Sequence, residues 1–70
     1  MVVRLTRKGR VAALKRAIIA VGGPSALAEF LGLSVQAVSQ WNEVPPLRVL
    51  DVEKATGVPR TELRPDLYPD

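Results

Sequence analysis

Glycine and proline divide this 70-residue chain into short segments, and these breaks constrain its fold more than any other feature. They fall at Gly22-Gly23, at Gly32, at Val44-Pro45-Pro46 and at Gly57. Glycine adopts the left-handed conformation that ends helices, and proline pushes the residue before it out of the helical region. Each segment therefore has room for one short element only.

Hydrophobic periodicity indicates that these short elements are helices. In the first segment, apolar residues recur at spacings of three and four, which is typical of a helix with one buried face. They are Val11, Leu14, Ile18 and Val21. A second helix is expected from Pro24, with Ser25 or the residues just before it as its cap. Its expected core face holds Ala26, Leu27, Phe30 and Leu31.

The remaining segments also predict helices. Ser34 is a good N-cap for a third helix over roughly 35–41, and a fourth runs from about Pro46 to Thr56, with Gly57 as its cap. A short final turn is expected over 60–63. No strand-like alternation appears, so the sequence predicts an all-α, compact bundle of four to five short helices. Residues 11–70 form the single domain, and residues 1–10 are an N-terminal arm or the frayed start of the first helix.

Composition excludes several chemistries. The chain contains neither cysteine nor histidine, so disulfides, Cys/His zinc sites and Ser-His-Asp triads are ruled out. A domain this small has no room for a deep pocket, and we expect no enzyme, no metal and no cofactor. No apolar run approaches the roughly 20 residues of a membrane span, and the basic start does not resemble a secretory signal. We therefore expect a cytoplasmic protein with no membrane partner.

Charge is distributed unevenly along the chain. Residues 1–40 carry six basic side chains against Glu29 alone, whereas residues 41–70 carry four basic and six acidic ones. The positive half is a candidate surface for a polyanion, since cationic side chains release the counterions of nucleic acids. A solvated, solubilising surface would have the same composition, and charge alone leaves both interpretations open.

Residues 24–43 have the pattern of two helices joined by a tight turn. Such helices cross closely only where a small residue lies at the contact, and Ala28 meets that need. Gly32 permits the turn, while Leu33, Val38 and Trp41 can anchor the second helix to the core. This arrangement is typical of a DNA-binding helix-turn-helix.

The helix after the turn has one wholly polar face. At about 100° per residue, Ala37, Val38 and Trp41 lie together, and the opposite side holds Gln36, Ser39, Gln40 and Glu43. Gln36 and Gln40 are one turn apart, and each amide offers the donor and acceptor that match the N6 and N7 edge of adenine. Ser39 can bond to base edges or to phosphates. The alternative is that this is the ordinary wet side of a surface helix.

Two further features suggest contacts. The arm is expected to touch the DNA backbone, with a solubilising tail as the alternative; its basic residues are Arg4, Arg7, Lys8 and Arg10. The fourth helix carries apolar residues on two sides, with Leu47 and Leu50 nearly opposite Val49 and Val52. One stripe, with Leu67 or Tyr68, is expected to form a homodimer contact, unless the C-terminal tail folds back over it.

Residues 11–69 resemble the small Cro-type repressors of the lambda-repressor-like helix-turn-helix superfamily. Within it they are most similar to the YdaS-type group, whose members are described as Cro-like phage regulators or candidate antitoxins. The resemblance rests on Gly22-Gly23-Pro-Ser-Ala-Leu-Ala, Leu31-Gly32-Leu-Ser-Val-Gln-Ala-Val-Ser-Gln-Trp41, Val44-Pro45, Thr56-Gly57 and Glu62-Leu-Arg-Pro-Asp-Leu-Tyr-Pro69.

The resemblance implies a dimeric repressor that binds a double-stranded DNA operator. On the matching positions, Ser34, Gln36, Ser39 and Gln40 would read bases, while Ser25 and Asn42 would contact the DNA backbone. This chain departs from the family in having Pro24 where relatives often have glutamine, and Asn42-Glu43 where they tend to be basic, so the role of Glu43 stays open. The alternatives are an antitoxin with a cognate toxin, and a helical protein-interaction module that does not bind DNA.

Overall fold

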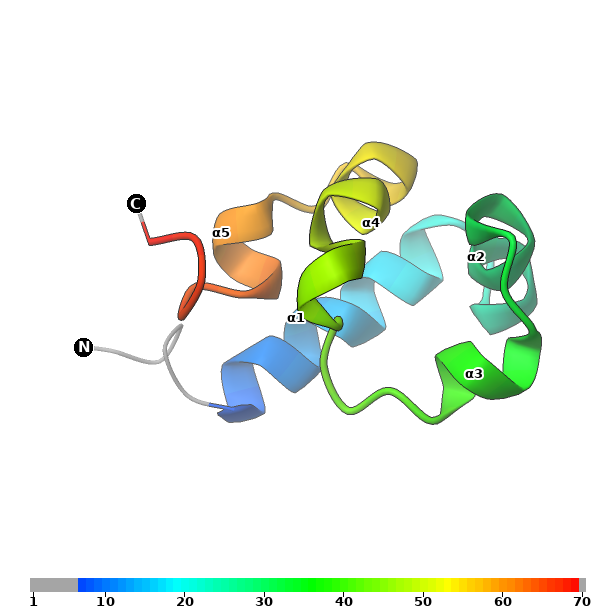
Figure 1. Cartoon of the computed structure of the whole chain (residues 1–70), viewed down its shortest axis with the longest axis horizontal. Coiled ribbons are helices and arrows are strands. Elements are labelled where there is room, and N and C mark those ends of the chain that lie inside the picture. The colour runs from blue at the N-terminus through cyan, green and yellow to red at the C-terminus, as the bar shows by residue number, and fades with distance from the viewer. Residues whose placement is uncertain (1–6, 70) are drawn as a thin grey trace.

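The computed structural model describes residues 7–69, and every regular element in that range is helical. In chain order they are α1 (Arg7–Ala20), α2 (Pro24–Leu31), α3 (Val35–Ser39), the 3₁₀ turn η2 (Pro46–Arg48), α4 (Val49–Thr56) and α5 (Arg60–Leu63). The helix α1 runs along the length of the molecule, with α2 and α3 at one end and α5 at the other (Figure 1). The predicted all-α bundle of short helices is confirmed.

Three helix boundaries differ from those expected. The helix α1 begins at Arg7 instead of Val11, so residues 7–10 belong to the first helix, while residues 1–6 lie outside the described range. The helix α3 ends at Ser39 because Trp41 already donates to the carbonyl of Val38, a tighter turn at 3.1 Å. The expected fourth helix starts as the 3₁₀ turn η2, directly after Pro45.

Two hydrophobic clusters form the core. The larger joins α1, α4 and α5, and its buried members are Ala13, Leu14, Ala17, Val44, Val49, Val52 and Leu63. The smaller joins α2 and α3 through Leu27, Ala28 and Val38. Trp41, Leu31 and Ile18 pack against both clusters and make them continuous. The end of the molecule that carries the helix-turn-helix is thereby fixed to the rest of the bundle.

The expected core face of α2 is wrong at one residue. Phe30 is 65% exposed, whereas Leu27 and Ala28 are buried and Leu31 is half-buried. At 100° per residue the buried face centres between Leu27 and Ala28, which places Phe30 at its edge. The helix packs closely through its alanine, and the larger aromatic ring is left on the outside.

In the described part of the chain, no single helix is long and apolar enough to cross a membrane. Gly9–Ala20 and Pro24–Leu31 reach the required length and composition only when taken together, and they are bent by 86° at the break between them.

Candidate nucleic-acid interface

The connection between α2 and α3 is a glycine turn of defined geometry. Gly32 has φ 72° and ψ 28°, the left-handed conformation that glycine adopts without steric cost. The amide of Leu33 donates to the carbonyl of Ala28 at 2.8 Å, and the amide of Gly32 donates to Glu29 at 3.2 Å. These bonds satisfy carbonyls at the end of α2 and reverse the chain within two residues. Ala28 is 2% exposed, as expected for the small residue at the crossing.

The two helices after the glycine breaks begin differently. Ser34 is the N-cap of α3, as predicted, and its Oγ accepts a hydrogen bond from the amide of Ala37 at 3.1 Å. The N-cap of α2 is Gly23, which has no side chain to offer. Ser25 is exposed in the first turn of α2 without a capping bond. Its hydroxyl is therefore available at a helix N-terminus, where the dipole favours anions.

The polar face of α3 is uncovered. Gln36, Ser39 and Gln40 are exposed, while Val38 on the other side of the helix is 1% exposed. The amide of Gln40 donates to the carbonyl of Gln36 at 3.2 Å, so the two glutamines stay one helical turn apart, about 6 Å along the axis. Asn42 follows and is also exposed. The predicted division of this helix into a buried and a solvent-facing side is confirmed.

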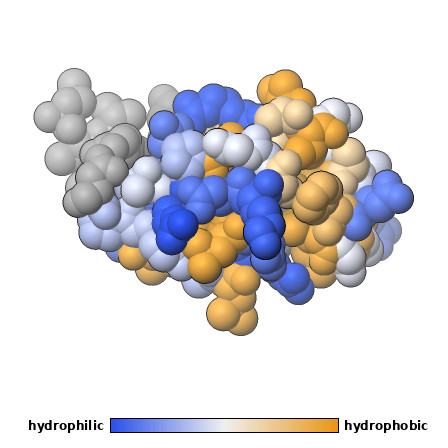
Figure 2. Space-filling model, turned by 90° about the horizontal axis from the view of Figure 1, so that it is seen from above, coloured by the Kyte–Doolittle hydropathy of each residue, from blue (hydrophilic) through white to orange (hydrophobic). Residues whose placement is uncertain are grey.

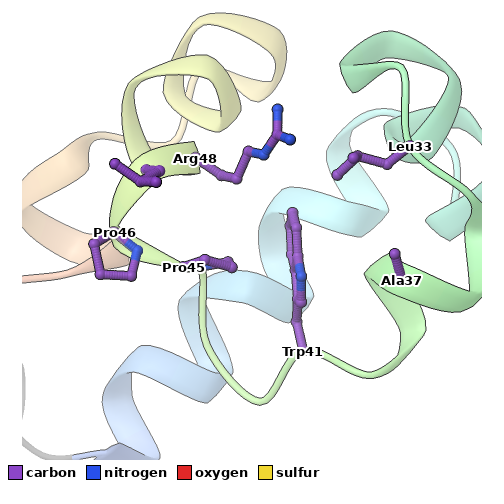
Figure 3. A pocket seen from close by; sticks show the side chains of 7 residues that line it. Leu33, Ala37, Trp41, Pro45, Pro46 and Arg48 are labelled. Atoms are coloured by element: carbon purple, nitrogen blue, oxygen red, sulfur yellow. The ribbon is translucent and has the colours of Figure 1, made fainter.

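An apolar hollow of about 500 Å³ lies beside α3. Its lining comes from α3, from the segments before and after it and from η2, and consists of Leu33, Ala37, Trp41, Pro45, Pro46, Leu47 and Arg48. Figure 3 shows the Trp41 ring standing between Pro45 on one side and Ala37 on the other. Trp41 is half-buried and packs against both core clusters, so its expected role as a core residue is confirmed.

Glu43, whose role the sequence left open, turns toward α1. Its Oε1 accepts a hydrogen bond from Nε of Arg10, and Asp66 Oδ1 lies 3.9 Å from the same Arg10 nitrogen. The carboxylate is thus neutralised within the chain. Arg10 was expected on the DNA backbone; its Nε lies in this internal ion pair, and the expected DNA contact stays a prediction.

The other expected arm contacts stay predictions. Arg4 lies outside the described residues, and Arg7 and Lys8 form the first turn of α1, with side chains that the structure does not describe. Among the described residues, no cluster of three Asp or Glu side chains could hold a metal ion.

The residues expected at a dimer contact divide into two groups. Leu47, Leu50 and Leu67 are exposed, at 92%, 48% and 43%. Tyr68 is half-buried against the larger core cluster, with the Arg60 guanidinium 5.7 Å from its ring centre. Folding back of the tail thus accounts for Tyr68 and leaves Leu47 and Leu50 uncovered. Figure 2 shows hydrophobic surface on both sides of a hydrophilic ridge, with one hydrophobic group protruding at the molecule's edge.

Sequence reasoning gave Arg64 no role, although it lies within the C-terminal motif that carried the resemblance. Arg64 is 9% exposed, and its guanidinium donates hydrogen bonds to Asp66 and to the carbonyl of Val44. The presence of an arginine in an otherwise proline-rich tail was the available signal.

Comparison with known proteins gives one family. The family model described as "Bacterial toxin YdaS" matches residues 14–70. A relative from Escherichia coli (strain K12), YdaS, whose name describes it as a candidate transcriptional regulator, is 42% identical over 59 residues. That match covers 76% of this chain, and the chain spans 60% of the relative's length. No solved structure matches. The helix-turn-helix with its polar third helix is therefore that of a YdaS-type protein, and the chain belongs to this family.

Proposed function

We propose that this protein is a sequence-specific, double-stranded DNA-binding transcriptional regulator that inserts α3 into the major groove, in the manner of a Cro-like repressor. The observation that carries the proposal is the exposed Gln36–Ser39–Gln40 face on a helix held by a tight glycine turn. A major groove admits one helix, and paired glutamine amides match the edge of adenine. The name of the E. coli relative supports a role in transcription.

The DNA backbone would be held on either side of α3. The hydroxyl of Ser25 and the amides of Ser25 and Ala26, which precede the first amide bonded in α2, suit a phosphate because the helix dipole points its positive end there. Asn42 would contact the backbone beyond the other end of α3. Ser34 already accepts from Ala37, and its hydroxyl proton can still be donated to a base or phosphate. Arg4, Arg7 and Lys8 would add sequence-independent attraction.

A protein-interaction module that does not bind DNA is the main competing function, and an antitoxin with a cognate toxin partner is a variant of the proposal. The printed descriptions name a toxin for the family and a regulator for the relative. The uncovered amide pair on α3 favours the regulator, because a module without DNA would have no need of it. Such a regulator would act at the bacterial nucleoid, in the cytoplasm.

The test is to select bound duplexes from a random pool at near-physiological salt and then to measure the variants Gln36→Ala and Gln40→Ala on the selected site. Each variant is expected to cost about 1–3 kcal/mol of specific binding and to relax the base preference at one position. Its affinity for unrelated duplex should not change, because no charge is altered.

Thr61→Ala is the control for that experiment. It truncates a polar side chain on α5, which packs against α1 and α4. Its affinity for both kinds of duplex should match the parent protein. Failure to select any sequence, together with binding that does not weaken as salt is added, would favour the interaction module.

We also propose that the protein forms a homodimer through the exposed apolar surface that Leu47 of η2 and Leu50 of α4 present. Two copies related by a two-fold axis would place their α3 helices about 34 Å apart, one turn of DNA, and give a palindromic site. Leu47→Asp is expected to shift the protein from dimer to monomer in sedimentation on DNA or at high concentration, because it puts a charge into an apolar contact. Ile19→Asp, at a residue 76% exposed on α1, is the matched control. An unchanged dimer in Leu47→Asp ends this idea.

A further inference from the structure

The C-terminal tail holds a buried arginine against the segment that leaves α3. Arg64 Nη1 donates to the carbonyl of Val44 at 2.9 Å. Its Nε and Nη2 donate to the two oxygens of Asp66, at 3.0 and 2.8 Å. Arg64 thus binds Asp66 within the tail and also the backbone of Val44, which lies twenty residues earlier in the chain.

A second arginine binds Glu43, the residue before Val44. Arg10, from the first half of α1, pairs with the carboxylate of Glu43, and it lies 3.9 Å from Asp66. Glu43 and Val44 are consecutive, so two arginines from opposite ends of the chain hold adjacent residues. Asp66 lies next to both guanidinium groups and links the two contacts into one cluster of alternating charge.

The segment so held has few other restraints. In the part of the chain that the structure describes, no hydrogen bond joins the backbone of residues 42–44 to another backbone group, between the turn at Trp41 and the one that begins at Pro45. The side chain of Val44 is fully buried, while Asn42 is exposed. Because neither α3 nor η2 extends into this segment, the arginine contacts supply the polar interactions that set its path.

We propose that Arg64, with its partners Asp66, Glu43 and Arg10, positions the exit of α3 on DNA, so that the C-terminal motif acts on base recognition without touching the DNA. This inference rests on the proposed function. It makes Arg64 a positioning residue, which fixes the end of α3 that carries Gln40 and Asn42. It also explains why an acidic residue is tolerated in the segment that follows α3: the carboxylate of Glu43 is paired with Arg10.

Two variants, Glu43→Gln and Arg64→Lys, separate the effect of charge on DNA binding from the effect of geometry. Glu43→Gln removes a negative charge, so by electrostatics alone it should strengthen binding to any duplex. If Glu43 helps to position α3, the ratio of specific to non-specific affinity should fall by about tenfold or more, the loss of one good base contact. Glu62→Gln is the matched control, because it removes the same charge from another ion pair. Its partner Arg16 lies on α1, as Arg10 does. It should leave the ratio unchanged.

Arg64→Lys keeps the positive charge and supplies a single ammonium, which lacks the planar fork that serves Val44 and Asp66 together. We expect the same fall in the ratio, measured at a temperature where the variant is fully folded. An unchanged ratio in both Arg64→Lys and Glu43→Gln would reduce the cluster to a stabilising role and overturn the proposal.

Hydrogen exchange of the free protein separates this proposal from the DNA-binding function. The amides of Gln40 and Trp41, which donate to Gln36 and Val38 at the end of α3, should exchange faster in Glu43→Gln and Arg64→Lys, whereas those of α1 and α4 keep their parent rates. Faster exchange in a protein that binds no DNA would refute the proposed function and leave the positioning contact in place. Parent-like exchange at Gln40 and Trp41 would refute the positioning contact, whatever the protein binds.

Discussion

Replacing Leu27 by alanine is expected to lower the free energy of unfolding by about 2–5 kcal/mol, measured by urea denaturation. Leu27 is among the largest of the fully buried side chains. It lies in the cluster that joins α2 to α3, with Trp41 and Ala55 packed around it. Truncation removes apolar burial and leaves a cavity, and both effects destabilise. In a domain this small the loss is a large part of the total stability.

Phe30→Ala is the matched control for this prediction, because it truncates a larger apolar side chain on the same helix. Phe30 is 65% exposed, so its truncation should change the free energy of unfolding by no more than about 0.5 kcal/mol. Comparable losses in the two variants would mean that α2 is rotated about its axis relative to the structure described.

The contrast between these two residues marks a limit of the sequence pattern. Periodicity placed Leu27 and Phe30 on one face, since apolar residues cover a wide arc of α2. Which part of that arc is buried depends on how α2 packs against α3, and Ala28, a small residue, lies in the buried cluster between them. The same holds in α1, where Ala13 and Ala17 are buried and Ile19 is exposed. Small residues at helix crossings carry little hydrophobic signal, although packing selects them.

Local chemistry, in contrast, was well predicted. The glycine conformation at Gly32, the cap at Ser34 and the end of α4 at Gly57 depend on a few neighbouring residues, and each matched expectation. The exposed face of α3 followed from helix geometry once the inward position of Val38 was assumed. The candidate site was therefore predictable in its central part, because a helix fixes the directions of its own side chains.

Charge pairing could not be predicted in this way. Arg10 and Glu43 are 33 positions apart, and Arg64 and Val44 are 20 apart, so no local spacing reveals either contact. Counting charges along the sequence assigned Arg10 to DNA, whereas the fold brings it to a carboxylate. The net charge of a segment measures how much charge it holds, and only the tertiary structure determines how much of that charge is available to a partner.

Replacing Arg64 by methionine is expected to lower the free energy of unfolding by about 2–3 kcal/mol near neutral pH. The variant keeps apolar volume but leaves the carbonyl of Val44 without its charged donor, and hydrogen bonds to charged groups contribute about 1.5–3 kcal/mol. Arg16→Met is the matched control, since it breaks an exposed ion pair with Glu62 and should cost no more than about 1 kcal/mol. Equal losses in the two variants would contradict a buried role for Arg64.

The same variant should also change the response to acid. The hydrogen bond from Arg64, reinforced by the nearby charges of Arg64 and Arg10, holds the pKa of Asp66 below its usual value. A carboxyl with a lowered pKa in the folded state stabilises the fold fully above its unfolded pKa, about 3.9 for aspartate, and loses that contribution as pH falls through the folded pKa. Urea denaturation at pH values below about 4 should therefore show a shallower loss of stability in Arg64→Met than in the parent protein, and Asp66→Asn should reproduce this shallower slope. Parallel pH curves for the parent and both variants would show that Asp66 draws no stabilisation from Arg64, because the loss of this coupling is what produces the difference in slope.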